Sequence, residues 1–113
     1  MTKERALKFD ELIKKELGKI LFEFLETEPG ILVTITRVIT APNLFESEIY
    51  ISVYPSDFAK KILEKLNKSI WKIQQELNKN FKVRPVPKII FKHDKNPEEA
   101  SEVEKLIKKV QKR

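Results

Sequence analysis

The segments ILVTITRVIT (residues 31–40) and SEIYISVY (residues 47–54) decide how this chain folds. The first is dense in β-branched residues, which favour strands because their side chains pack well on a pleated surface. The second alternates Ile49, Ile51 and Val53 with polar residues, so one face of this strand is expected to be buried and the other wet. A short connection that begins with Ala41-Pro42-Asn43 separates the two segments. We therefore predict an antiparallel hairpin over residues 31–54.

Amphipathic helices are predicted on both sides of this hairpin. Apolar residues recur every three or four positions over residues 4–25, and again from Phe58 to about Asn78. Ser56 or Asp57 is placed to cap the second helix. A straight helix of about 25 residues would extend roughly 37 Å, about the width of a domain of this size. We therefore expect a bend, although the unbroken apolar period does not locate it.

The rest of the chain adds a third strand and a last helix. Residues 86–91 are predicted as a strand, and Pro85 and Pro87 at its entrance suit an edge or the start of a strand. Asn96-Pro97 and the two acids that follow are typical of a helix start, which places a C-terminal helix at residues 97–113. The resulting order, α-β-β-α(-α)-β-α, predicts an α+β fold in which helices collect on one face of a three-stranded sheet.

The composition limits both the size and the chemistry of the molecule. A chain of 113 residues, 41% of them hydrophobic, is expected to form a single domain over residues 1–113. It has no cysteine, one histidine and two glycines, which excludes thiol catalysis, multi-histidine metal sites and glycine-rich phosphate loops. No apolar run reaches the ~20 residues that span a bilayer. We therefore expect a cytoplasmic protein that is not an enzyme and has no cofactor, metal, small-molecule substrate or membrane partner.

The net charge of +6 is concentrated in one segment. Residues 56–92 hold 10 basic and 3 acidic residues, or +7, whereas the other 13 basic and 14 acidic residues sum to −1. Five lysines of the second helix fall within a narrow arc opposite its apolar stripe: Lys61, Lys65, Lys68, Lys72 and Lys79. Like charges four residues apart, as in Lys61/Lys65 and Lys68/Lys72, destabilise a helix. This cost favours contact with phosphates over the alternative of an ordinary solvated face.

Aromatic residues near this arc and on the hairpin leave two interpretations open. Trp71 lies off the apolar stripe between Lys68 and Lys72, where it could stack on a base. A packing role at the helix flank or at a bend is the preferred interpretation for a tryptophan. Tyr50 and Tyr54, on the polar side of the second strand, are either open to a ligand or covered by a helix.

Several short stretches together resemble the ribosome-binding factor A family. They are VTITRV (residues 33–38), Asn43-Leu44 ahead of IYIS (residues 49–52), VRPVPKIIF (residues 83–91) and Asp94. The resemblance covers nearly the whole chain and implies a type II KH-like fold, α-β-β-α-kink-α-β. The family carries Ala-x-Gly at the kink. The corresponding place here is Ser69-Ile70-Trp71, with Trp71 where glycine is usual.

The resemblance also implies a function. It points to a non-catalytic assembly factor that binds the immature small (30S) ribosomal subunit and assists maturation of the 5′ region of its 16S rRNA. Ribosome biogenesis, rRNA processing and cold adaptation are the processes it implies. The alternatives are a general RNA-binding KH-like module and a protein-interaction or dimerisation domain without RNA binding. We expect a monomer whose RNA-binding residues are Lys61, Lys65, Lys68, Ser69, Trp71, Lys72, Lys79, Lys82, Arg84 and Lys88.

Overall fold

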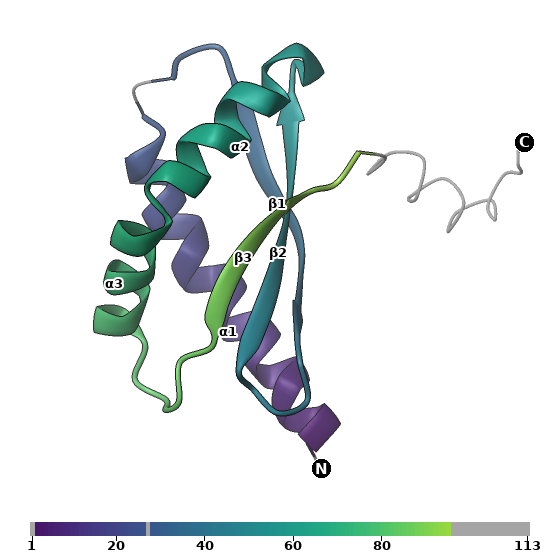
Figure 1. The fold of residues 1–113 in the computed structure, drawn as a ribbon, viewed down its shortest axis with the longest axis vertical. Helices are drawn as coiled ribbons and strands as arrows, with labels where there is room; N and C mark the ends of the chain where they lie inside the picture. Colours follow the sequence, from purple (N-terminus) through teal and green to yellow (C-terminus); the bar gives the residue numbers. More distant parts are fainter. Residues whose placement is uncertain (1, 27, 96–113) are drawn as a thin grey trace, which may run out of the picture.

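A computed structural model describes residues 2–26 and 28–95 of the chain (Figure 1). The elements confirm the predicted order and the α+β class, whereas the KH-like label and the single domain stay predictions. The helix predicted for residues 97–113 lies outside the described residues. The elements are α1 (Thr2–Phe24), β1 (Leu32–Thr40), β2 (Glu46–Tyr54), the 3₁₀ turn η1 (Ser56–Phe58), α2 (Ala59–Lys68), α3 (Ile70–Asn80) and β3 (Lys88–His93).

The strands form one mixed sheet in the order β1-β2-β3. β1 and β2 make the predicted antiparallel hairpin, and their register shifts at a bulge between Ile35 and Arg37. β3 is parallel to β2, because α2 and α3 carry the chain back before it enters the sheet. β3 is an edge strand, as its prolines indicated. It begins at Lys88, two residues later than predicted, because Pro87 has no N–H for the ladder.

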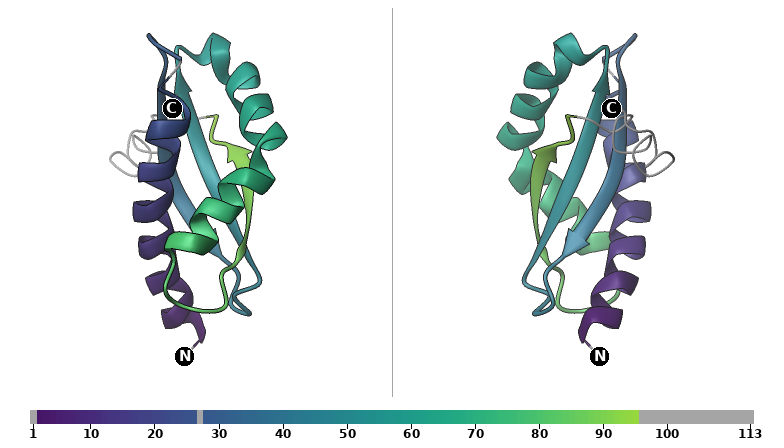
Figure 2. Two further views of the ribbon diagram at one scale, coloured as in Figure 1. Left: turned by 90° about the vertical axis from the view of Figure 1, so that its left-hand side faces the viewer. Right: turned by 90° about the vertical axis from the view of Figure 1, so that its right-hand side faces the viewer.

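The described helices α1, α2 and α3 lie on one face of the sheet, as the predicted layering has it for them (Figure 2). The core fills the space between the two layers. Its polar members, Thr40 and Ser47, satisfy each other through their hydroxyl oxygens at 2.7 Å. The following core residues are each at most 1% exposed: Ile13 and Leu17 from α1, Ile49 and Ile51 from β2, Ile62 and Leu66 from α2, and Ile73 and Leu77 from α3.

The opposite face of the sheet carries the polar side chains of the strands. The Arg37 guanidinium lies 4.3 Å from the centre of the Tyr50 ring. The Tyr50 hydroxyl donates to Glu48 at 3.0 Å, and this bond raises the pKa of Tyr50. None of the helices α1 to α3 covers this face, and Tyr54 is 73% exposed.

Candidate nucleic-acid interface

The long helical segment is divided at Ser69 into α2 and α3, and the two helices lie at an angle (Figure 2). Ser69 has φ −106° and ψ 16°, close to the sparsely populated bridge region. Its N–H is shared between the carbonyls of Lys65 at 3.3 Å and Leu66 at 3.2 Å, and its own carbonyl accepts the N–H of Ile73 at 3.0 Å. The expected bend therefore lies where the family resemblance placed it. Trp71, which stands in place of the usual glycine, does not prevent it.

Trp71 projects into solvent from the first turn of α3. Its side chain is 73% exposed, so the preferred packing interpretation is wrong. After the bend, Ile70 and Ile73 take the core side of α3 and leave the indole on its flank. The neighbouring Lys68 and Lys72 are also exposed, and neither forms an ion pair with the residues that the structure describes. An open indole between two cations suits base stacking combined with phosphate contact.

Lys61 and Lys65 of the predicted arc turn towards an acid instead. Glu28, in the connection between α1 and β1, pairs with Lys61 at 3.3 Å and with Lys65 at 2.8 Å. The Lys65 ammonium also lies 5.7 Å from the centre of the Phe24 ring. The hydrogen bond from Lys65, followed by that from Lys61, lowers the pKa of Glu28. Glu28 therefore engages two of the five lysines, and the contact of all five with RNA stays a prediction.

The basic residues at the end of α3 are divided as well. The Arg84 guanidinium donates to the backbone carbonyls of Phe81 and Asn78, so it closes the C-terminal end of α3. Lys79 pairs with Glu76 at 3.8 Å in an exposed contact, which contributes little to holding it in place. Lys82 is exposed in the following loop, and Lys88 is exposed at the start of β3 on the open face of the sheet.

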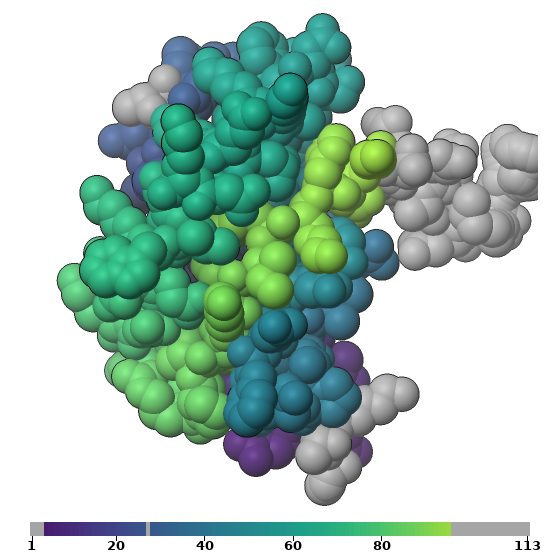
Figure 3. Space-filling view, in the orientation of Figure 1, coloured from purple at the N-terminus to yellow at the C-terminus, as the bar shows by residue number. Residues whose placement is uncertain are grey.

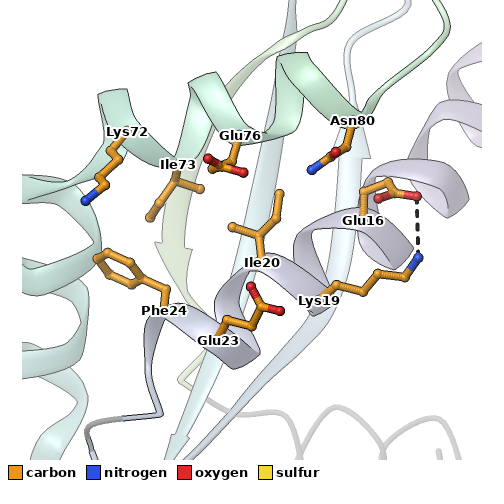
Figure 4. A pocket seen from close by; sticks show the side chains of 9 residues that line it. All are labelled: Glu16, Lys19, Ile20, Glu23, Phe24, Lys72, Ile73, Glu76 and Asn80. Atoms are coloured by element: carbon orange, nitrogen blue, oxygen red, sulfur yellow. Dashed lines mark ion pairs between the residues drawn. The ribbon is translucent and has the colours of Figure 1, made fainter.

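A groove of about 420 Å³ between α1 and α3 does not suit phosphates (Figure 4). Acids outnumber lysines along it, and Glu16 is paired with Lys19 at 3.8 Å. Phosphate binding needs an excess of positive charge. The outer side of α2 and α3, which Figure 3 displays on one face of the molecule, is the better candidate. The groove-lining charged residues are Glu16, Glu23, Glu76, Lys19 and Lys72.

We define the bend surface as Lys68, Ser69, Trp71 and Lys72, of which Lys72 also lines the groove between α1 and α3. Lys79 and Lys82 continue it along α3 and into the next loop. This surface offers charge and stacking rather than covalent chemistry.

Among residues 2–26 and 28–95, no group of three or more acids, histidines or cysteines is placed to hold a metal ion. The helices in that part of the chain are too short or too polar to cross a membrane.

We expect Glu28→Gln to lower the melting temperature at neutral pH by removing the pairs with Lys61 and Lys65. Because the pKa of Glu28 is lowered from 4.5 in the folded protein, the stabilisation is present above that value and is lost as the pH falls through the folded pKa. The difference in melting temperature between wild type and variant should therefore narrow between about pH 7 and about pH 3. Thermal unfolding followed by circular dichroism measures it. Glu26→Gln, at an exposed neighbour, is the control, and an equal difference at both pH values would contradict the assignment.

Comparisons with known proteins point to one family. The family model for ribosome-binding factor A matches residues 5–107. A ribosome-binding factor A from Desulfitobacterium hafniense is 30% identical over 111 residues, which cover 97% of this chain and 89% of that protein. Another from Geotalea daltonii is 32% identical over 108 residues, or 95% and 88% of the two chains. The crystal structure of ribosome-binding factor A from Thermus thermophilus matches with a TM-score of 0.66 at 15% identity, over 78% of this chain and 94% of that one, and thus has the same fold.

Proposed function

Because this chain belongs to the ribosome-binding factor A family and is thus a ribosome-associated factor, we propose that it is a non-catalytic assembly factor for the small (30S) ribosomal subunit. It binds the immature subunit and assists maturation of the 5′ region of 16S rRNA. It acts as a monomer in the cytoplasm, where it contributes to ribosome biogenesis, rRNA processing and adaptation to cold. No catalytic step, cofactor or small-molecule substrate is required of it.

The bend surface carries the proposed mode of docking. Lys68 and Lys72 contact rRNA phosphates, and the indole of Trp71 between them stacks on an unpaired base. Lys79 and Lys82 extend the phosphate contacts along α3. Two observations support this assignment over Lys61 and Lys65: the indole is 73% exposed, and Glu28 engages the other two lysines.

Sedimentation through sucrose gradients at graded salt tests this function. We expect the purified protein to migrate with immature small subunits, not with large subunits, and to dissociate as the salt concentration rises, because phosphate contacts release counterions. Free rRNA of matched length is the control. Migration with all RNA to the same extent would favour a general RNA-binding module. Absence of migration with any subunit would favour a protein-interaction domain.

A further inference from the structure

In the described part of the chain, β1 and β3 are the edges of the sheet, and the structure protects them unequally. On β3, the N–H of Ile89 donates to the Gln74 side chain at 2.9 Å, and Gln74 donates to the carbonyl of Pro87 at 3.1 Å. On the second half of β1, the Asp10 carboxylate accepts the N–H of Thr40 at 2.8 Å. A bulge precedes that half of the strand. Such caps and bulges keep an edge from pairing with a further strand.

Within residues 2–26 and 28–95, the first half of β1 presents backbone groups that have no hydrogen-bond partner. The carbonyl of Ile51 accepts the N–H of Asp94 at 2.8 Å, so it faces β3 and not β1. Ile35, which lies opposite Ile51, is therefore at a position without hydrogen bonds to β2. Val33 is at the next such position, because the bonds of an antiparallel ladder alternate. The N–H and C=O groups of Val33 and Ile35 consequently point outward from the edge.

A groove of about 610 Å³ runs along this same half of β1, beside α1. Its walls include Phe22 from α1 and Leu32 from β1, which are 78% and 62% exposed. Gly18 lines it from the middle of α1, where glycine weakens a helix. A Cβ atom at Gly18 would meet no heavy atom within 4 Å, so no packing contact in the described structure requires this glycine. The space beside it is open to a ligand.

We propose that this groove accepts an extended segment of another protein, which adds to β1 as a fourth strand. Val33 and Ile35 supply the backbone donors and acceptors, and the apolar walls receive alternate apolar side chains. Lys14 on α1 and Glu26, two residues beyond the end of α1, stand at the two ends of the groove, and the helix from Lys14 to Phe24 rises about 15 Å. That length holds about five extended residues.

The charges at the two ends orient the segment. Lys14 also lies beside the bulge region of β1, since it lines a second hollow with Thr36, and Glu26 lies towards the start of the strand. α1 and β1 run in opposite directions (Figure 1). A segment antiparallel to β1 therefore places an acidic residue at its beginning, next to Lys14, and a basic residue at its end, next to Glu26.

Other occupants suit this groove less well. Nucleic acid needs basic walls, whereas the walls here are mostly apolar and the acids Glu26 and Glu28 outnumber Lys14. A second copy of the chain would bring its own α1 against this α1, because the helix flanks the β1 edge in each copy (Figure 2). A single extended strand fits beside α1 without this conflict.

A defined peptide tests the proposal on the full-length, isotope-labelled protein. The probe is Glu-Val-Thr-Val-Thr-Val-Lys with blocked ends, and its control carries proline in place of the central valine, which removes a backbone donor. We expect the probe to shift the NMR signals of Gly18, Phe22, Val33 and Ile35, and to slow amide exchange at Val33 and Ile35 at least about tenfold. Shifts centred elsewhere, or none at millimolar peptide, would overturn the proposal. The proposal would also be overturned if raising the protein concentration alone, or adding rRNA, gave the same protection of Val33 and Ile35.

Gly18→Leu supplies the matched variant. Leucine is a better helix former than glycine and has room here, so the melting temperature should be equal or higher. The same side chain fills the groove and should weaken binding of the probe at least about tenfold. Lys15→Leu, on an exposed position of α1 outside the groove, should bind the probe as wild type does. Equal binding by both variants would contradict the proposed site.

Discussion

Replacing Lys68, Lys72, Lys79 and Lys82 by glutamine is expected to weaken binding to immature small subunits by about 10²–10³-fold near physiological salt. Each lysine that meets a phosphate releases counterions. The plot of log affinity against log salt has a negative slope, and its magnitude should therefore decrease by about 3 to 4 in this variant. Glutamine keeps good helix propensity, and these side chains lie outside the core. The melting temperature should therefore stay within about 2 °C of wild type.

Two control variants separate the docking surface from net charge and from structural ion pairs. Glutamine at Lys61 and Lys65 should lower the melting temperature, because Glu28 loses both partners, with a much smaller effect on affinity. Glutamine at four lysines of α1 removes as much charge as the first variant and should leave binding nearly unchanged. Equal loss from the α1 variant would mean that only net charge matters. The four α1 positions are Lys3, Lys8, Lys15 and Lys19.

Trp71→Ala is expected to weaken binding by about 10- to 100-fold, since stacking of one base on an aromatic ring is worth about 1–3 kcal/mol. Stability should not fall, because the indole is 73% exposed. Trp71→Phe should restore most of the affinity by keeping an aromatic face.

The chain has one tryptophan, so its fluorescence reports on this site without a label. Stacking on a base should quench the emission when subunits bind. Unchanged emission together with normal binding by Trp71→Ala would exclude a stacking role.

Local patterns made most of the fold predictable. The alternation in residues 47–54 and the three- and four-residue spacing in residues 4–25 correspond to β2 and α1, because each pattern arises from burial of one face. The bend at Ser69 is different, since Leu66, Ile70 and Ile73 keep helical phase across it and both helices bury the same stripe. Its position could be predicted only from the family resemblance.

The candidate site was less predictable because contacts distant in the sequence reshape it. Glu28 precedes Lys61 and Lys65 by 33 and 37 residues, and no local pattern indicates that the fold would bring them together. The average behaviour of tryptophan favours a packing role for Trp71, although its place between Lys68 and Lys72 also suits base stacking. The bend instead places the two isoleucines of this turn on the core side of α3. Arg84 is predicted to bind RNA from its place in the basic tract, and the local sequence does not indicate that its guanidinium also binds the end of its own helix.

Chemical acetylation of lysines, in the free protein and in its complex with immature small subunits, tests the central claim most directly. Mass spectrometry measures the reactivity of each lysine in both states. We expect strong protection of Lys68, Lys72 and Lys82 in the complex, and equal reactivity of Lys8 and Lys15 on α1 in both states. Unchanged reactivity of Lys68 and Lys72, with protection of the α1 lysines or of Lys88 and Lys92 on β3, would contradict docking through the bend surface.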